Sequence, residues 1–171
     1  GWYTEQGDVY TSTAMPSNSI KLMAKWYKIK TKTIVLYELN SRDVVSRTSP
    51  SMANSKTIDL SDIYTSGTMT VEMKLHFYMY VSGNANGSRP KSGCIDIYNQ
   101  SVASGQYLVW SISKSPIKAG TWEEYEEIKT ITITSNKLYY CSYMSNSGLY
   151  YEAGFTDVYF TISYPDTTTL Y

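Results

Sequence analysis

The sequence predicts an all-β protein built as an antiparallel sandwich or barrel. Three observations lead to this prediction. One long stretch, 71–81, alternates strictly between apolar and polar residues. Several short segments rich in β-branched and aromatic residues follow one another, separated by turns that contain Gly, Pro or Asn. No helical pattern of ten or so residues alternates with these segments, which argues against a parallel α/β sheet.

The stretch 71–81 is the clearest strand in the chain. Its apolar positions are Val71, Met73, Leu75, Phe77, Met79 and Val81, and the polar or amphipathic positions between them are Glu72, Lys74, His76, Tyr78 and Tyr80. A helix would scatter these residues around its circumference, whereas a strand places all the apolar ones on one face. We therefore expect a half-buried strand whose second face points towards solvent or a ligand.

Further strands are expected on both sides of this stretch. They are a weak signal within 2–10, two strands within 20–39, a short one within 40–47, and strands at 94–98, 107–112, 124–134, 138–144 and 155–163. Turns are expected at 12–19 and 146–148, and a Gly-rich loop at 82–93. Lys28, Lys30 and Lys32 share one side of their strand, which predicts a solvated face or a protected sheet edge, with a glycan or phosphate contact as the alternative. A helical turn is expected at 57–64.

Length and charge narrow the classes of partner. The 171 residues fit a single domain, 1–171, which we expect to be excised from, or part of, a larger protein. The 15 Lys and Arg residues balance the 15 Asp and Glu residues, so the net charge of the chain does not attract it to nucleic acid. The sequence contains no long apolar run, so we expect no membrane insertion. Tyrosine is abundant, with 18 copies against three phenylalanines, which suits either ordinary strands or a recognition surface.

Catalytic and metal-binding patterns are weak. His76 is the single histidine, and no nucleophile-elbow motif accompanies it. The carboxylates of 123–127 lie next to one another along a strand and so alternate between opposite faces. Cys94 and Cys141 allow one disulfide at most, and we expect them to be buried free thiols. We therefore predict a protein that is not an enzyme.

Binding is the better-supported class of function. The outward side of the central strand presents His76, Tyr78 and Tyr80. If the strand 94–98 lies next to it and buries Ile95 and Ile97, Asp96 and Tyr98 join the same outward face. Aromatic rings beside a carboxylate and an imidazole suit sugar rings; the same group also suits the polar surface of a half-wet sheet or a patch against a neighbouring subunit.

The second half of the chain resembles a known family. The segments 120–125 (Gly-Thr-Trp-Glu-Glu-Tyr) and 154–158 (Gly-Phe-Thr-Asp-Val) carry a resemblance to the galactose-binding-like jelly rolls, which include carbohydrate-binding modules of bacterial glycosidases and of phage tail and adhesion proteins. The resemblance covers about 68–163. Members commonly have two adjacent acidic residues before the Val of the last strand. Here Asp157 is kept and Thr156 takes the other place, so the structural calcium that the family often holds is unsupported.

Together these observations predict an antiparallel β-sandwich of jelly-roll type with roughly eight to ten strands. The resemblance implies a non-catalytic carbohydrate-binding accessory module that recognises a glycan or polysaccharide in an extracellular, cell-surface or virion setting. The alternative is a structural or protein-interaction domain of a phage tail, baseplate or other extracellular assembly, whose partners are neighbouring domains or subunits. No cofactor is expected. Trp110 is expected in the core, and Trp122 at a structural corner.

Overall fold

A computed structural model describes most of the chain. The described residues are 2–4, 22–24, 27–45, 47, 49–82, 92–115, 120–144 and 152–170. The expected turns at 12–19 and 146–148, and most of the loop at 82–93, lie outside them. The chain forms two compact units, one made of Thr31–Tyr164 and the other of Gly1–Lys30 with Pro165–Tyr171. The expectation of a single domain over 1–171 stays a prediction.

The described residues form strands and two short 3-10 helices, with no α-helix among them. In chain order these are β1 (Trp2–Thr4), β2 (Leu22–Ala24), β3 (Tyr27–Tyr37), β4 (Asp43–Val45), η1 (Met52–Asn54), β5 (Lys56–Asp59), β6 (Met69–Val81), β7 (Gly93–Tyr98), η2 (Gly105–Tyr107), β8 (Leu108–Lys114), β9 (Glu123–Ile133), β10 (Lys137–Met144) and β11 (Ala153–Leu170). Within this part of the chain, no helix is long and apolar enough to cross a membrane.

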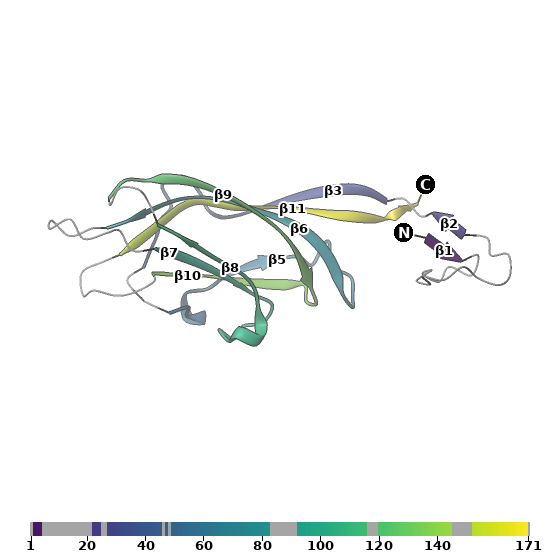
Figure 1. Ribbon diagram of the computed structural model, residues 1–171, viewed down its shortest axis with the longest axis horizontal. Coiled ribbons are helices and arrows are strands. Elements are labelled where there is room, and N and C mark those ends of the chain that lie inside the picture. Colours follow the sequence, from purple (N-terminus) through teal and green to yellow (C-terminus); the bar gives the residue numbers. More distant parts are fainter. Residues whose placement is uncertain are drawn as a thin grey trace. The chain divides into compact units, whose positions relative to one another are not determined.

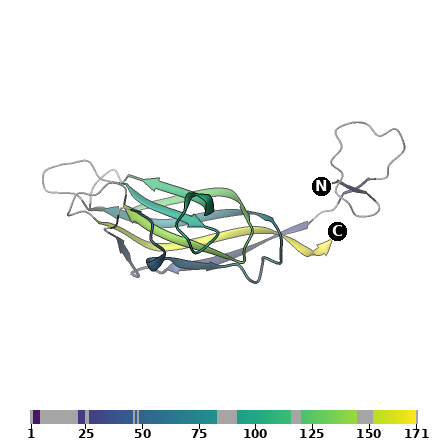
Figure 2. The same cartoon turned by 90° about the horizontal axis from the view of Figure 1, so that it is seen from below.

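Two antiparallel sheets pack face to face in the larger unit (Figures 1 and 2). A four-stranded sheet has the order β5-β10-β7-β8, and a five-stranded sheet has the order β3-β11-β6-β9 with β4 paired to β11. Setting aside β4 and the separate β1-β2 pair, the first main strand lies beside the last. Successive strands alternate between the sheets except for β7 and β8, which pair with each other, and this is the order that the two Greek keys of a jelly roll produce. The predicted jelly-roll sandwich is therefore confirmed.

The core lies between the two sheets and is centred on β6. β6 pairs with β11 on one side and with β9 on the other. Its six alternating apolar side chains are all buried, as predicted. They meet Ile95, Ile97 and Trp110 of the four-stranded sheet, and Phe155 and Phe160 of β11. Trp110 is thus a core residue, as its phase with Ile112 indicated.

β3 lies at one end of the strand order of the five-stranded sheet and carries Lys28, Lys30 and Lys32. Ile34 and Leu36 pack against the core, so Val35 between them points outward. The lysines before them pair with acids: Lys30 Nζ lies 2.8 Å from Asp166 Oδ2, and Lys32 Nζ lies 2.5 Å from Asp62 Oδ1. Charged side chains on an end strand discourage pairing with another chain, in agreement with the predicted protected edge.

The predicted helical turn at 57–64 forms only in the second half of the segment, where Leu60 O accepts hydrogen bonds from the N–H groups of Ile63 at 3.0 Å and Tyr64 at 2.8 Å. Residues Lys56–Asp59 form strand β5, which pairs with β10. A short turn follows, in which the Asp59 carboxylate accepts hydrogen bonds from the Ser61 backbone N–H at 3.0 Å and from the Ser61 hydroxyl at 2.6 Å. Asp59 thus caps this turn. The first half of the segment pairs as a strand and so does not join the turn.

Both cysteines are free and buried, as expected. The Cys141 thiol points to Ser51 O at 3.7 Å, beneath the segment that contains η1. Burial is the main reason that the pKa of this thiol rises to about 11. A buried thiol that stays protonated at neutral pH is a poor nucleophile, so Cys141 acts as a small apolar residue of the fold.

We predict that the two faces of β6 differ sharply in their contribution to stability. Leu75→Ala removes a fully buried side chain and should lower the free energy of unfolding by about 2–5 kcal/mol. Lys74→Ala, one position earlier on the outer face, should change it by less than about 1 kcal/mol. Urea denaturation followed by tryptophan fluorescence measures both, and equal losses would contradict the assigned faces.

We also predict that the thiols react only after unfolding. In the folded chain, a disulfide reagent such as Ellman's reagent should label neither Cys94 nor Cys141 within the time that it labels free cysteine, because both are buried. In denaturant both should react at once. A Cys94→Ser variant isolates Cys141, and rapid labelling of that variant at neutral pH without denaturant would show that the thiol is accessible.

Candidate binding site

His76, Tyr78 and Tyr80 lie on the outer face of the five-stranded sheet, as their alternation along β6 indicated. Tyr78 and Tyr80 are half-buried, and His76 is only 6% exposed because its neighbours on the face cover it. Tyr80 donates a hydrogen bond to Glu152 Oε1 at 2.7 Å. Burial, assisted by this hydrogen bond, raises the pKa of Tyr80 to about 12.

Asp96 and Tyr98 do not join this face. The expectation that strand 94–98 neighbours the central strand is wrong, because β7 pairs with β10 and β8 in the other sheet. The alternation of strands between the sheets separates β6 from β7. Since Ile95 and Ile97 fill the core from the second sheet, Asp96 and Tyr98 lie on the opposite side of the sandwich from His76. The predicted five-residue group therefore does not form one site.

The Asp96 side is covered by the protein itself. Tyr98 donates a hydrogen bond to Asp96 Oδ2 at 2.9 Å, and both residues are buried. Desolvation is the main reason that the pKa of Tyr98 rises above its ordinary value. The segment around η1 lies over the adjacent strand β10, where the Cys141 thiol faces Ser51 O at 3.7 Å and Met52 Sδ at 3.8 Å. This arrangement is an internal polar pair beneath a loop rather than an open platform for a sugar.

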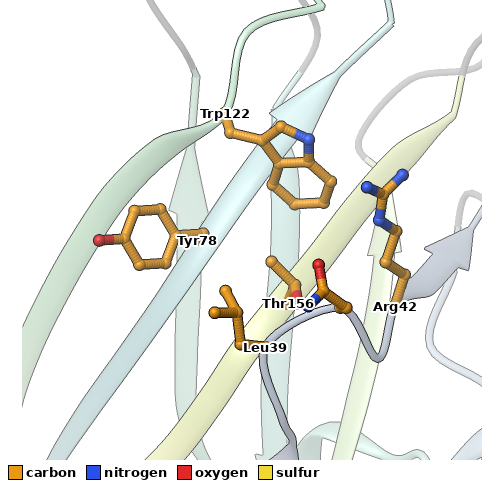
Figure 3. Close-up of a pocket in the computed structure, with 6 residues that line it drawn as sticks. Leu39, Arg42, Tyr78, Trp122 and Thr156 are labelled. Atoms are coloured by element: carbon orange, nitrogen blue, oxygen red, sulfur yellow. The ribbon is translucent and has the colours of Figure 1, made fainter.

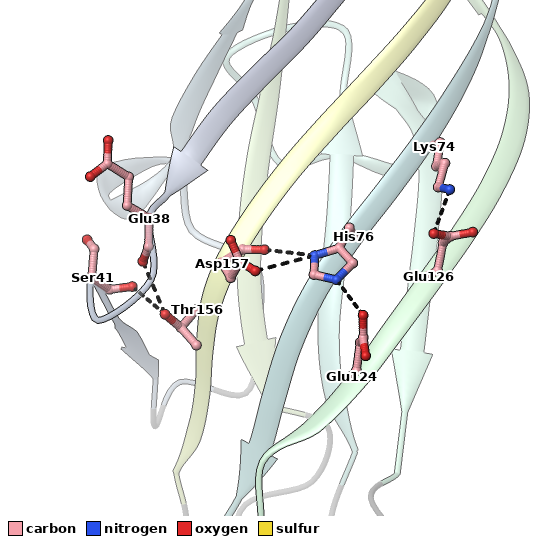
Figure 4. Close-up of polar contacts among 8 residues, drawn as sticks. All are labelled: Glu38, Ser41, Lys74, His76, Glu124, Glu126, Thr156 and Asp157. Atoms are coloured by element: carbon pink, nitrogen blue, oxygen red, sulfur yellow. Dashed lines mark hydrogen bonds and ion pairs between the residues drawn. The ribbon is translucent and has the colours of Figure 1, made fainter.

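His76 lies within a network of polar contacts, which Figure 4 shows, and it also packs against two aromatic rings. Its Nε2 is 2.9 Å from Glu124 Oε1, and its Nδ1 is 3.1 Å from the backbone oxygen of Asp157. The ring stacks on Tyr159 with centroids 4.6 Å apart and meets Tyr78 edge-on at 5.5 Å. Both ring nitrogens therefore face oxygen atoms of the fold.

A β-bulge in β11 gives the His76 network its geometry. The pairing of β11 with β6 shifts between Thr156 and Tyr159. Within the bulge, Asp157 adopts a left-handed backbone conformation with φ of 50°. Asp is one of the residues that tolerate this conformation, and a bulge re-aims backbone groups. Nearby, Lys74 Nζ pairs with Glu126 Oε2 at 2.6 Å, so the charges of this face are largely matched to one another.

A pocket of about 220 Å³ lies beside this network on the same face (Figure 3). It is lined by Leu39, Asn40, Arg42, Tyr78, Trp122 and Thr156. The Thr156 hydroxyl lies 3.2 Å from Glu38 O and 3.0 Å from Ser41 O, so it holds the 38–41 turn against β11. Asn40 adopts φ of 73° in that turn, a conformation that Asn accepts more easily than most residues.

Gly154 leaves room for the aromatic rings that pack beside the pocket. Gly154 pairs with Tyr80 on one side and with Val44 on the other. A Cβ at this position would meet a Tyr80 ring carbon at 2.0 Å and Trp122 at 3.1 Å. The absent side chain therefore lets the Tyr80 ring pack edge-on to the Trp122 indole at 4.7 Å. Trp122 lies between the turn at Gly120 and the start of β9, which is the corner position expected for it.

The sequence analysis missed five of the six lining residues as site candidates. Only Tyr78 was among the predicted binding residues. The segments 120–125 and 154–158 were singled out, and the structure brings them together here through Trp122 and Gly154. Nothing local in the sequence links them to Arg42, because that contact depends on the pairing of β4 with β11. Among the described residues, no group of three or more potential ligands could hold a metal ion.

We predict that Gly154→Ala destabilises the protein. The added methyl group overlaps the Tyr80 ring, and the overpacking should cost about 1–3 kcal/mol in the free energy of unfolding. Gly105→Ala is the matched control, because a Cβ at that position meets no atom within 4 Å. Thermal unfolding of the two variants tests this, and a Gly154→Ala variant as stable as the control would mean that Tyr80 and Trp122 move aside freely.

Comparisons with known proteins give distant structural matches only. No family model matches the sequence, and no curated protein matches it. Among solved structures, a chain in the structure of infectious bursal disease virus, Gx strain, is 10% identical in sequence to this chain with a TM-score of 0.44. The match covers 94% of this chain and 38% of the viral chain. The T13 particle of the same virus is 11% identical with a TM-score of 0.44, over 95% and 37%. Its VP2 subviral particle is 9% identical with a TM-score of 0.41, over 98% and 41%.

These findings overturn the resemblance to galactose-binding-like carbohydrate-binding modules. No such family model matches, and the solved structures that match are virus particles instead. The chain spans about two fifths of the length of those viral chains. Identity and TM-score are too low to transfer any role. The segments that carried the resemblance have a local explanation, because Gly154 and Trp122 satisfy a packing requirement of this sheet's outer face.

Proposed function

We propose that this chain is a non-catalytic jelly-roll module with a structural role in a larger protein assembly. It contacts neighbouring subunits through the outer face of the five-stranded sheet. The observation that carries the proposal is a set of exposed apolar side chains on that one face. The assembly is one in an extracellular or virion setting, which was expected from the sequence and stays a prediction.

The exposed apolar residues come from strands at both ends of the sheet. Val35 on β3 is 53% exposed and Ile128 on β9 is 58% exposed. At the end of the face that holds the pocket, Leu39 is 70% and Val44 is 48% exposed. Val44 points outward because its neighbour Val45 is buried in the core. These four side chains share one face of the sheet, and the apolar area that they expose is area that a protein contact would bury.

The two outer faces of the sandwich differ in how they are covered. On the four-stranded sheet, the segment around η1 lies over β10 and shields Cys141, which is buried. On the five-stranded sheet, the outward positions of β9 are exposed at Glu126, Ile128 and Thr130. The edge strand β8 of the four-stranded sheet exposes Ser111 and Ser113 on its outer side. The five-stranded sheet therefore offers a neighbouring subunit the more apolar face.

The ionisable groups of this face also support a structural role. His76 bonds to Glu124 and to the Asp157 backbone, and Lys74 pairs with Glu126. These contacts hold adjacent strands β6, β9 and β11 together. A side chain that satisfies its neighbours in this way stiffens the sheet, and it is not directed into the pocket as a general acid or base would be.

We predict that the chain self-associates through this face. Sedimentation equilibrium should show a mass that rises with concentration, and Val35→Asp combined with Ile128→Asp should weaken the association at least tenfold, because burying a carboxylate in an apolar contact is unfavourable. Val102→Asp is the matched control, since Val102 is 50% exposed but lies after β7 of the other sheet. A chain that remains monomeric and instead binds reproducibly on a glycan array would contradict the proposal.

A further inference from the structure

The pocket beside Trp122 has an apolar interior although polar residues line it. The Tyr78 hydroxyl is engaged with Glu124, whose charge and hydrogen bond raise the pKa of this phenol. Figure 3 shows that hydroxyl on the side away from Trp122 and Arg42. The Thr156 hydroxyl is engaged with the carbonyls of the 38–41 turn. The surfaces left for an occupant are therefore the Tyr78 and Trp122 rings and the side chain of Leu39.

Arg42 adds a positive charge at the rim of this pocket. Its guanidinium carbon lies 5.4 Å from the centroid of the Trp122 ring, so the indole face orients it. Among the residues that the structure describes, Arg42 forms no ion pair with a carboxylate. Arg42 is also exposed. A cation held in place by an aromatic ring, beside an apolar hollow, is complementary to an anion carried next to an apolar group.

The size of the pocket limits what can enter. Its volume of about 220 Å³ is below the roughly 300–1,000 Å³ that is usual for small-molecule sites. One side chain fits such a volume, whereas several linked sugar rings do not. Interfaces between proteins commonly place a single aromatic or aliphatic anchor in a pocket of this kind.

We infer that this pocket receives one apolar side chain, aromatic or branched aliphatic, from a neighbouring protein subunit, and that Arg42 pairs with a carboxylate adjacent to that side chain. This inference rests on the proposed function and specifies the partner's chemistry. Leu39, Tyr78 and Trp122 supply the apolar contact, and Arg42 selects an acidic neighbour. Asn40 is positioned at the same rim by its turn and is available to a backbone group of the partner.

A carbohydrate fits this pocket less well than an apolar side chain. A sugar ring can stack its C–H face on the Tyr78 or Trp122 ring, but among the lining residues its several hydroxyl groups find further hydrogen bonds only at Asn40, Arg42 and the Trp122 indole N–H. Each hydroxyl that loses water without gaining a partner costs free energy. The chemistry of the lining therefore favours a peptide segment, and sugar binding becomes an outcome of the test.

The inference is tested with small probes followed by nuclear magnetic resonance of the isotope-labelled full chain. Phenylacetate carries an apolar ring beside a carboxylate, and phenylacetamide has the same ring without the charge. Phenylacetate should shift the Trp122 indole N–H and the Leu39 methyl signals saturably, with a dissociation constant on the order of millimolar. Phenylacetamide should bind about threefold to fivefold more weakly, the amount expected of an exposed ion pair.

Two variants separate the charge from the pocket. Arg42→Gln should reduce the affinity for phenylacetate to that for phenylacetamide and leave the amide unaffected. Lys137→Gln is the matched control, because it removes an exposed cation at the start of β10, and it should change neither affinity. Both substituted residues are exposed, so each variant should keep the amide spectrum of the folded chain.

Three results would overturn the inference. One is the absence of saturable shifts at Trp122 and Leu39, and another is equal affinity for acid and amide in the parent chain. The third is tighter binding of N-acetylneuraminate or methyl β-galactoside than of phenylacetate, which would assign the pocket to sugars. The titrations use chain dilute enough to be monomeric. Loss of self-association would thus show failure of the proposed function, and loss of probe binding would show failure of this inference alone.

Discussion

The burial of one face of β6 is the constraint on which the rest of the structure depends. β6 lies inside its sheet, with β11 and β9 on either side, and all six of its alternating apolar side chains are withdrawn from water. Fully burying a large apolar side chain contributes about 1.5–3 kcal/mol. A slip of one residue would turn Lys74 and His76 towards the core. The pairing register of β6 with β11 and β9 is therefore fixed, because any shift by one residue would bury charged side chains.

The same constraint produces the outer face of the sheet. Once the apolar positions of β6 point inward, the intervening residues must form a second surface, and the structure links them across strands. His76 joins β6 to β9 through Glu124 and to β11 through the Asp157 backbone. The bulge at Asp157 and the missing side chain at Gly154 adapt β11 to the large rings beside it. On this surface the ionisable side chains His76 and Lys74 bond to residues of neighbouring strands, whereas several apolar side chains stay exposed.

That combination explains why the proposals concern contact with another protein. Catalysis needs an ionisable group directed at a bound substrate, whereas His76 is held between two strands of its own sheet. Association needs apolar area that water would otherwise cover, and Leu39, Val44 and Ile128 provide it. Arg42 differs from the other charges that we have described on this face, because its observed contact is with an aromatic ring rather than a carboxylate.

Much of the fold was determined by the sequence alone, because alternation along a strand is a local property with period two. It placed the faces of β6 and the core position of Trp110 correctly. The partners of each strand were decided by tertiary structure. Asp96 and Tyr98 have the alternation of an outward face, yet the jelly-roll crossover puts them on the other side of the sandwich. The pocket unites Arg42, Trp122 and Thr156, which are far apart in sequence, because β4 and β9 flank the β11–β6 pair at one end of the sheet. Only the long-range pairing of strands, which local periodicity does not encode, brings such residues together.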